Sequence, residues 1–342
     1  MLRRDLEARA AELGFARVFV CALPDYRRWR ERVTAMPDAH FAGLTDDVSG
    51  VLDGKCVAVA LIRPYRPYDA PAGCATVSAY YPASDAAHRA ALELAQWLEA
   101  RGYRAVGSPN IPFKPVITQS GHAAYGRNGV TGMAEFGSRY ALQLVLTDAP
   151  LSVDPVGPEA GELSRMCARC GRCVRACPTG ALDGTGRVDV YRCVRARSDE
   201  YPMDEAFRRH IGRSLYGCDI CQDVCPRNAR IPLRPMPEPL AQALRLEALL
   251  AGDVSGLVPY IGKNFARKAR MQAKACVIAA NLNRTELLPQ VAACLNSPVE
   301  FVRDHARWAM ERLKAEERFE AETPEGMPGE VESLPELPDA LK

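Results

Sequence analysis

Two runs of cysteines constrain this chain more than any other feature. In order, they are Cys167-x2-Cys170-x2-Cys173-x3-Cys177-Pro178 and Cys218-x2-Cys221-x3-Cys225-Pro226. In a run spaced like the first, three close cysteines hold one 4Fe–4S cubane, and the fourth, before proline, ligates a second cubane. The second run supplies only three cysteines, and Cys193, alone between the runs, is the natural eighth thiolate. Eight thiolates predict two 4Fe–4S clusters and the transfer of single electrons.

A disulfide framework and a pair of zinc sites are the alternatives. Disulfide scaffolds are typical of small secreted domains that lack a core, whereas this chain has 342 residues, 48% of them hydrophobic, enough for its own core. Zinc sites usually show two CxxC pairs and no such four-cysteine run before proline, so we favour iron–sulfur clusters. The other cysteines lie in apolar or alanine-rich segments and are expected to be buried structural thiols: Cys21, Cys56, Cys74, Cys276 and Cys294.

The sequence shows no membrane segment and no export signal. No apolar stretch reaches the roughly 20 residues that a membrane helix needs. Arg3 and Arg4 resemble a twin-arginine signal, but Asp5 and Glu7 follow at once and no apolar segment comes after them. Together with reduced thiols, this predicts a cytoplasmic protein. The net charge of +2 neither requires nor excludes a nucleic-acid partner.

Residues 1–158 are expected to form an α/β domain, because segments with helical and strand patterns alternate along them. Helical spacing of apolar residues predicts helices, and continuous apolar runs predict buried strands. The predicted helices are Leu2–Leu13 and Asp85–Arg101, and the predicted strands are Cys56–Ile62 and Tyr140–Leu146.

The rest of the chain divides into three expected parts. Residues 159–235 predict a ferredoxin-like two-cluster domain, and residues 236–315 predict short helices in a HEAT-like series. In that series, helices are expected at Arg267–Asn281 and Glu286–Leu295, and Ser297-Pro298 has the pattern of a capped helix start. Residues 316–342 are rich in Glu and Pro and predict a disordered acidic tail.

Two further segments concentrate unusual residues. Tyr125–Gly129 and Glu135–Ser138 combine glycines with Asn128; on physical grounds alone they favour tight turns over a ligand site. Ile111-Pro112-Phe113-Lys114-Pro115 predicts a stiff extended stretch with one lysine, which is either a pocket residue with a lowered pKa or a solvated loop side chain.

The sequence around the cysteines resembles that of the epoxyqueuosine reductase family. The resemblance rests on Ala176–Leu182, on the lone Cys193 and on Ile211–Pro226, which includes Gly-Cys-Asp-Ile-Cys-Gln-Asp-Val-Cys-Pro. Upstream, Gly126–Gly129, Phe136–Ser138 and Leu146–Leu151 are similar to the corrinoid-binding half of that family. Downstream, Asn281 and His305–Ala309 are similar to its HEAT-like end. The similarity thus covers about residues 1–315.

The resemblance implies an α+β fold in which a nitroreductase-like domain holds cobalamin close to two 4Fe–4S clusters. It implies that Cys167, Cys170, Cys173 and Cys225 ligate one cluster, and that Cys177, Cys193, Cys218 and Cys221 ligate the other. It also implies a set of corrinoid contacts: Gly126, Arg127, Asn128, Gly129, Thr131, Gly137, Ser138, Leu142 and Gly217.

The function implied by the resemblance is reduction of epoxyqueuosine in tRNA to queuosine. Electrons would come from a flavodoxin or ferredoxin, and the partner would be a tRNA anticodon stem-loop. The family has a proton-donating aspartate in the stretch that corresponds to Ser108–Pro115, where this chain has no carboxylate. Gly126-Arg127-Asn128-Gly129 is also similar to the related reductive dehalogenases, whose acid is a tyrosine assisted by a basic residue. Lys114 and Tyr125 are therefore the candidate donors in this chain.

Two other functions stay open at this point. One is a corrinoid-dependent reductive reaction on a different substrate, such as dehalogenation of a small molecule. The other is a non-catalytic electron carrier that reduces the corrinoid of a partner protein. The first alternative keeps the pocket and changes its substrate, whereas the second needs no substrate pocket.

Removal of iron is expected to unfold residues 159–235, because the cysteine spacing leaves little room for a hydrophobic core and the clusters must supply the folding energy. Circular dichroism and limited proteolysis before and after chelation measure this. An iron-free protein that kept its full secondary structure and protease resistance in this segment would contradict the cluster assignment.

Overall fold

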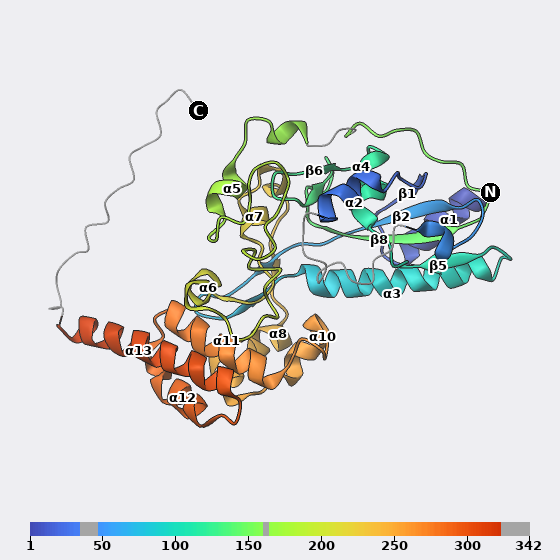
Figure 1. Cartoon of the computed structure of the whole chain (residues 1–342). Helices are drawn as coiled ribbons and strands as arrows, with labels where there is room; N and C mark the ends of the chain where they lie inside the picture. The colour runs from blue at the N-terminus through green and yellow to red at the C-terminus, as the bar shows by residue number, and fades with distance from the viewer. Residues whose placement is uncertain (35–46, 160–163, 323–342) are drawn as a thin grey trace.

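The computed structural model describes residues 1–34, 47–159 and 164–322 (Figure 1). A sheet with its helices comes first, a loop-rich segment with the cysteine runs follows, and a helical end completes the described chain. The predicted mixture of helix and sheet is confirmed. Within the described residues, no helix combines the length and the apolar character needed to cross a membrane.

The main sheet has four strands in the order β1 (Arg17–Cys21), β2 (Val57–Pro64), β8 (Tyr140–Thr147) and β5 (Ala105–Gly107). All neighbouring pairs are antiparallel. The two central strands, β2 and β8, pair along their whole length and coincide closely with the strands predicted from the sequence. These two strands therefore form the centre of the first half of the chain.

Both faces of the sheet are buried, which explains the continuous apolar runs. Val59 and Leu61 of β2 pack against α1 (Leu2–Glu12) and α3 (Tyr80–Glu99), while Ala58 belongs to the core on the opposite face. That second core includes residues of α4 (Phe113–Gln119), and α2 (Arg27–Thr34) lies on the same side. α3 begins at Tyr80, before the predicted Asp85, because Ser78 Oγ accepts a hydrogen bond from Tyr80 N at 3.3 Å.

The predicted extended stretch at Ile111–Pro115 is wrong from Phe113 onward, where α4 begins. Pro112 is the N-cap residue in an extended conformation, and Pro115 lies in the first turn. Proline is tolerated there because the first N–H groups of a helix have no intrahelical acceptor to lose. The helical turn places Lys114 on a helix that borders the second core.

Short strand pairs join segments that are far apart in sequence. β3 (Tyr68–Asp69) pairs in parallel with β10 (Arg234–Pro235), and β4 (Thr76–Val77) pairs in parallel with β9 (Ser214–Tyr216). Both pairs link the first half of the chain to the cysteine-bearing part: β9 lies between the two cysteine runs, and β10 follows the second run. A third pair, β6 (Ala124–Tyr125) with β7 (Thr131–Gly132), is an antiparallel hairpin, and Gly129 in its connection has a φ of +70°, as the predicted turn requires.

The cysteine-bearing segment contains only short helices: α5 (Arg172–Ala176), α6 (Glu205–His210) and α7 (Ile220–Asp223). α6 starts with an N-cap, since Asp204 Oδ1 accepts a hydrogen bond from Phe207 N at 2.8 Å. α5 and α7 lie side by side at one end of the molecule (Figure 1). Little regular structure supports this segment apart from its contacts to the sheet and the helical end.

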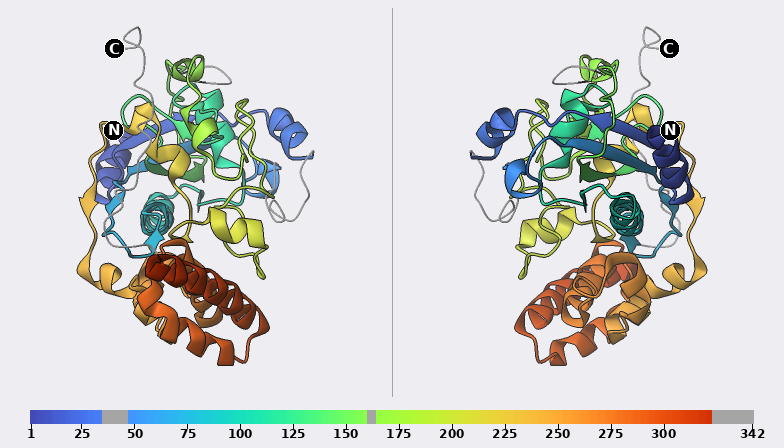
Figure 2. Two further views of the ribbon diagram at one scale, coloured as in Figure 1. Left: turned by 90° about the vertical axis from the view of Figure 1, so that its left-hand side faces the viewer. Right: turned by 90° about the vertical axis from the view of Figure 1, so that its right-hand side faces the viewer.

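The helical end packs beneath α3 (Figures 1 and 2). Its helices are α8 (Glu238–Ala243), α9 (Leu246–Ala251), α10 (Val258–Ile261), α11 (Lys268–Asn281), α12 (Leu288–Ala293) and α13 (Glu300–Glu322). α11 coincides with the predicted helix and is buried along most of its length against α9 and α13. The predicted helix at Glu286–Leu295 is instead a short α12 between two 3-10 turns, and Pro289 stands in its first turn.

The predicted start of an acidic tail at Glu316 is wrong, because α13 continues to Glu322. Alanine, glutamate and arginine dominate this stretch and are strong helix formers. The remainder of the predicted tail, residues 323–342, lies outside the described residues. The predicted capped start is only partly confirmed: Ser297 Oγ accepts a hydrogen bond from Val299 N at 3.2 Å, but α13 begins at Glu300, so Pro298 precedes the helix.

The unfolding free energy is expected to fall between pH 6.5 and pH 4 because of His305. This ring is fully buried; its Nε2 accepts a hydrogen bond from Met203 N at 3.3 Å, and its Nδ1 bonds the carbonyl of Phe301. Burial, with the charge of Arg208 nearby, lowers its pKa to about 4. The native state therefore resists protonation and loses about 2–3 kcal/mol as pH falls through this window. A His305→Gln variant keeps a donor and an acceptor; its stability measured against pH should lack this component, and equal pH profiles would contradict the assignment.

Candidate functional site

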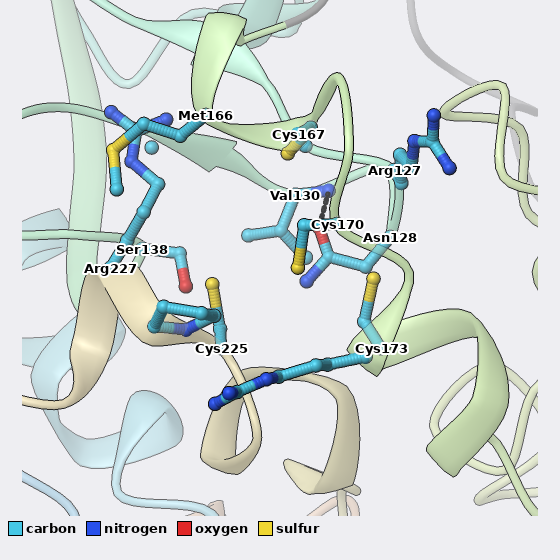
Figure 3. Close-up of a pocket in the computed structure, with 14 residues that line it drawn as sticks. Arg127, Asn128, Val130, Ser138, Met166, Cys167, Cys170, Cys173, Cys225 and Arg227 are labelled. Atoms are coloured by element: carbon cyan, nitrogen blue, oxygen red, sulfur yellow. Dashed lines mark hydrogen bonds between the residues drawn. The ribbon is translucent and has the colours of Figure 1, made fainter. Parts of the chain in front are cut away.

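One pocket brings together cysteines from both runs (Figure 3). Three parts of the chain form its wall: the β6–β7 hairpin, the first cysteine run and the end of the second run. Its lining residues are Gly126, Arg127, Asn128, Val130, Gly132, Ser138, Met166, Cys167, Cys170, Arg172, Cys173, Cys225, Pro226 and Arg227. The sulfur atoms of the four cysteines surround the middle of this pocket (Figure 3). We call Cys167, Cys170, Cys173 and Cys225 the outer cysteine group.

The other four cysteines of the two runs lie close enough to influence one another. The Cys218 thiol is affected by the charges of Cys193 and Cys177, and the Cys221 thiol by those of Cys218 and Cys193. Burial raises the pKa of Cys218 to about 11 and that of Cys221 to about 12. We call Cys177, Cys193, Cys218 and Cys221 the inner cysteine group. Iron binding at these thiols must release their protons, because the thiolate is the ligand.

Hydrogen bonds reach two sulfur atoms of the inner group. Ala181 N donates to Cys177 Sγ at 3.3 Å, and the Thr179 hydroxyl lies 3.5 Å from the same sulfur. Burial alone would raise the pKa of Cys177, but these bonds lower it overall. At Cys221, burial raises the pKa while a hydrogen bond from Asn128 opposes it. Asn128 therefore touches the inner group and also lines the pocket of the outer group.

Among the residues that the structure describes, no three His, Cys, Asp or Glu side chains are placed to share one metal ion. A 4Fe–4S cubane does not need several side chains at one metal ion, because each thiolate binds a different iron atom at a different corner. The two cysteine groups therefore suit a cubane better than a single zinc ion.

Several residues expected to contact a corrinoid instead bring the hairpin against the cysteine segment. Gly129 has a positive φ, and a Cβ there would collide with Val188. A Cβ on Gly137 would collide with Asn228 and Arg227. Thr131 is buried and accepts a hydrogen bond from the Tyr140 hydroxyl at 2.8 Å. These positions fix the approach of two chain segments, which the turn pattern alone did not reveal.

The remaining members of that predicted set lie apart from one another. Leu142 is a half-buried residue of β8 that packs against the second core. Gly217, next to Cys218, has a φ of +85°, and a Cβ there would lie 2.8 Å from the Tyr81 ring. The structure thus gathers Gly126, Arg127, Asn128 and Ser138 around the outer cysteine group and leaves Leu142 and Gly217 elsewhere.

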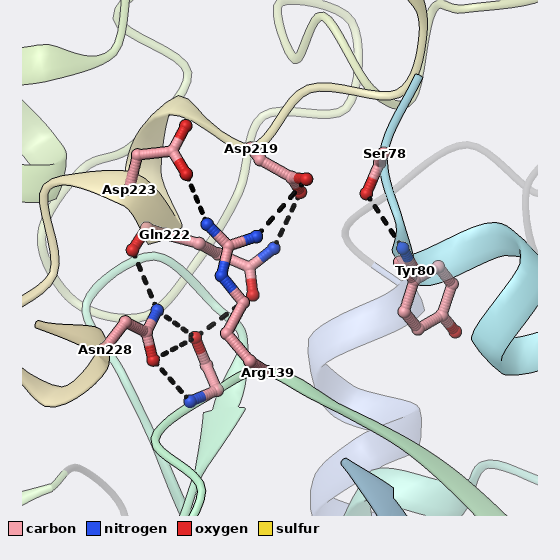
Figure 4. Close-up of polar contacts among 8 residues, drawn as sticks. Ser78, Tyr80, Arg139, Asp219, Gln222, Asp223 and Asn228 are labelled. Carbon is pink, nitrogen blue, oxygen red and sulfur yellow. Dashed lines mark hydrogen bonds and ion pairs between the residues drawn. The ribbon is translucent and has the colours of Figure 1, made fainter. Parts of the chain in front are cut away.

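A buried arginine ties the sheet to the inner cysteine group (Figure 4). Arg139, the residue before β8, is 2% exposed. Its Nη1 lies 3.2 Å from Asp219 Oδ2, and its Nη2 forms an ion pair with Asp223. The two carboxylates flank Cys221 in the sequence. The guanidinium therefore fixes α7 and its cysteine against the edge of the sheet.

An uncharged network reinforces this contact at Ser138, and Figure 4 labels its other members, Gln222 and Asn228. Asn228 Oδ1 accepts a hydrogen bond from Ser138 N at 2.8 Å, and Asn228 Nδ2 donates to Ser138 Oγ at 2.9 Å. Gln222 Oε1 accepts from Ser138 Oγ at 3.1 Å. All three side chains are buried. Because buried polar groups are costly when unpaired, this network positions the loop that carries Cys225.

The two candidate proton donors lie on neighbouring elements, Lys114 on α4 and Tyr125 on β6. Lys114 Nζ donates a hydrogen bond to the carbonyl of Gly129 at 2.9 Å. Burial, and then the charge of Arg195, lower the pKa of Lys114 to about 8. The side chain is nevertheless reached by solvent. Lys114 thus lies among protein groups and still reaches solvent, and we call this partly open space beside Lys114, with Arg195 nearby, the Lys114 recess.

The residues that the sequence analysis missed lie around Arg195, two residues after Cys193. The Arg195 guanidinium stacks over the Tyr80 ring at 4.4 Å from its centroid and lies 5.6 Å from that of Tyr81. Tyr65 packs edge-on against Tyr80, with ring centroids 6.1 Å apart. Burial raises the pKa of Tyr81 to about 12. The only sequence signal was the Tyr80–Tyr81 pair, which gives no hint of a partner in the cysteine segment.

Residues 166–228 match the family model of the 4Fe-4S double cluster binding domain. The curated epoxyqueuosine reductases of Listeria monocytogenes and Pseudomonas aeruginosa are 28% and 32% identical to this chain over 223 and 237 residues. These matches cover 60% and 64% of this chain and 55% and 64% of the relatives. The chain thus spans little more than half the length of the first of these relatives.

The fold extends the similarity along almost the whole chain. A structure of epoxyqueuosine reductase from Bacillus subtilis matches with a TM-score of 0.77 at 22% identity, covering 95% of both chains. A structure of epoxyqueuosine reductase with an epoxyqueuosine-modified tRNA stem loop matches with a TM-score of 0.74, also at 22% identity and 95% coverage. The resemblance to the epoxyqueuosine reductase family is confirmed. The prediction of a two-cluster domain is confirmed with it.

Replacing Arg139 with methionine should lower the unfolding free energy by about 2–3 kcal/mol, because Asp219 and Asp223 would lose their cation. This loss of unfolding free energy is smaller than is usual for a broken buried ion pair, because the Asp223 side chain is 57% exposed. Denaturant titration of the cluster-loaded protein measures the change. The matched control is Arg66→Met, an exposed arginine that lines the neighbouring cleft with Arg139. Equal stabilities of the two variants would show that the buried ion pair does not hold the inner group in place.

Proposed function

We propose that this chain is an oxidoreductase, a cobalamin-dependent iron–sulfur reductase that converts epoxyqueuosine in tRNA to queuosine in the cytoplasm. The observation that carries the proposal is the pair of cysteine groups beside the Lys114 recess, in a fold that matches epoxyqueuosine reductases over 95% of the chain. The matched structure with a modified tRNA stem loop supports a stem-loop substrate. An active site built in this way receives electrons on one side and the substrate on the other.

The outer and inner cysteine groups would each bind one 4Fe–4S cluster. Three thiolates of the outer group come from one short run and the fourth from the second run, which is the division that a two-cluster domain uses. Asn128, between the groups, would donate to the inner cluster through Cys221. Hydrogen bonds to cluster sulfur are one way in which a protein sets the reduction potential. A flavodoxin or ferredoxin-type carrier would supply the electrons.

A large planar cofactor would lie beside Lys114, Arg195 and Tyr80, where a lysine that reaches solvent is close to an arginine stacked on a tyrosine ring. Lys114 is open to solvent although protein surrounds it, and Arg195 presents its positive charge to the same space. A bound cobalamin would supply a strongly reducing cobalt centre for the reduction of the epoxide. Around it, the hairpin carrying Arg127 and Asn128 would shield the clusters, and the tyrosines of α3 would exclude water.

Lys114 is the residue we assign to protonate the leaving oxygen, and Tyr125 is the second candidate. With a pKa lowered to about 8, the Lys114 ammonium is still mostly protonated at neutral pH and releases its proton more readily than an ordinary lysine. Ser108–Pro115 contains no Asp or Glu, so this stretch offers Lys114 in place of a carboxylate donor. That same difference supports the second candidate function, corrinoid-dependent reduction of another substrate such as an organohalide.

Anaerobic reconstitution tests the proposal directly. The protein is loaded with iron, sulfide and cobalamin and given reduced flavodoxin and tRNA that carries epoxyqueuosine. We expect iron for two clusters, stoichiometric cobalamin and conversion of the modified nucleoside to queuosine by mass spectrometry. Stem-loop binding should weaken steeply with salt, because phosphate contacts release counterions. A protein that holds two clusters but takes up no cobalamin would be an electron carrier. A protein that binds cobalamin but does not convert the tRNA would act on a substrate of another class.

Lys114→Met should lower turnover by about 100-fold, within the range of general acid catalysis, while cobalamin and iron contents stay unchanged. Tyr125→Phe tests the second donor in the same assay. The control is Lys55→Met, which removes an exposed lysine outside the recess. The pH profile is the second readout: the alkaline limb of kcat, near the pKa of about 8, should disappear in Lys114→Met. An unchanged rate and pH profile would reject Lys114 as the donor.

A further inference from the structure

Four arginines are interleaved with the cysteines of the first run. They are Arg165, Arg169, Arg172 and Arg175, and they alternate with Cys167, Cys170 and Cys173. All four are exposed. No acidic residue occurs between positions 164 and 176. The surface that covers the outer cysteine group is therefore strongly positive although the whole chain carries a net charge of only +2.

Within the described part of the chain, none of these four side chains forms an ion pair or a side-chain hydrogen bond. This is unusual in the molecule, because many other arginines are paired. Arg104 pairs with Asp53 and Asp148, for example, and Arg284 pairs with Glu247 and Glu286. A nearby carboxylate, Asp223, borders the same surface with Arg172 and Arg175, but it is paired with Arg139. The four guanidinium groups are thus available to a partner.

An apolar residue stands in the middle of this charge. Met166 is 59% exposed and lines the same pocket as Cys167, Cys170 and Arg172. The cysteines themselves are partly exposed. α5, which carries Arg172 and Arg175, lies at the outer end of the molecule, away from the helical end (Figure 1). An apolar centre with a charged rim is the usual composition of a protein interface.

We propose that Arg165, Arg169, Arg172 and Arg175, with Met166, form the docking surface for an acidic one-electron carrier protein, and that electrons arrive at the outer cysteine group. The inference rests on the proposed function, which supplies the two clusters. In the step, the reduced carrier loses one electron and the oxidised outer cluster gains it; no bond forms or breaks. We call the five residues the arginine face.

The location of the charge favours a redox protein over a nucleic acid. The arginine face lies directly over the outer group, where an electron has the shortest path into the chain, whereas the inner group is deeper and adjoins the recess through Tyr81 and Arg195. Transient electron-transfer complexes use small interfaces, and complementary charge raises their association rate. If these arginines served only to balance the negative charge of the cluster, their guanidinium groups would not need to be exposed and unpaired.

The experiment measures reduction of the clusters rather than turnover of tRNA. Holoprotein is mixed anaerobically in a stopped-flow instrument with the hydroquinone of a flavodoxin, and bleaching of the cluster absorbance gives the second-order rate constant. The Arg172→Gln/Arg175→Gln variant should show a rate constant about tenfold lower at low salt, and the wild-type rate should fall as salt rises. Because no substrate is present, a failure of the tRNA activity leaves this result intact.

Two controls separate docking from other roles of the arginines. The Arg4→Gln/Lys263→Gln variant removes the same charge at distant exposed positions and should reduce at the wild-type rate. Reduced methyl viologen is a small cation, and its reaction with Arg172→Gln/Arg175→Gln should be no slower than with the wild type. If that variant loses iron, Arg165→Gln/Arg169→Gln and the salt dependence of the wild type decide the question.

Three outcomes would overturn the inference. The first is a wild-type rate that does not change with salt, and the second is equal slowing of flavodoxin and methyl viologen. The third is an unchanged flavodoxin rate together with weaker binding of a tRNA stem-loop, which would make the arginine face a nucleic-acid surface. A selective, salt-dependent loss with flavodoxin supports the proposal even in a protein that shows no activity on epoxyqueuosine.

Discussion

The buried Arg139 guanidinium is the constraint on which the placement of the cysteines depends. A buried cation needs counter-charges, and both of them come from α7, on either side of Cys221. Arg139 directly precedes β8, which pairs with β2 along its whole length at the centre of the sheet. A central strand of the sheet thus holds the cysteine-bearing segment, which has little regular structure of its own. Ser138, the preceding residue, does the same for Asn228 and so for Cys225.

The helical end approaches the inner group from the opposite side through Lys274. This lysine is 2% exposed, and its Nζ donates to the carbonyls of Ser198 and Leu215 at 2.6 and 2.7 Å. These carbonyls lie after Cys193 and before Cys218, so one ammonium spans the backbone between two members of the inner group. Burial lowers its pKa to about 7, which shows how closely the helices enclose it. A helical end with no cysteine of the runs therefore helps to hold cluster ligands in place.

The sequence predicted the features that depend on local pattern and missed those that depend on distant contacts. The strands β2 and β8 and the helix α11 follow from apolar periodicity, and the cysteine spacing indicates the clusters by itself. The helix that begins at Phe113 was missed because two prolines suggest an extended chain, whereas Pro112 is the N-cap residue and Pro115 lies in the first turn. The stacking of Arg195 on Tyr80 joins residues more than a hundred positions apart, and no periodicity encodes it. Glycines 129 and 137 were recognised as turns, but the side chains that approach them come from another segment.

The distribution of charge gives the two cysteine groups different surroundings. Unpaired arginines and a methionine cover the outer group, whereas the inner group adjoins tyrosines, Arg195 and the Lys114 recess. In the proposed reaction, electrons would enter at the solvent-facing positive surface and reach the surroundings of Lys114, where a proton would also be needed. Lys114 would suit that place because its surroundings favour the neutral amine that remains after the proton has left. A carboxylate there would carry a negative charge after donation, next to a cofactor that would itself become electron-rich. A lysine donor would therefore give the site a different charge before and after the reaction from that of a carboxylate, and with it a different range of substrates.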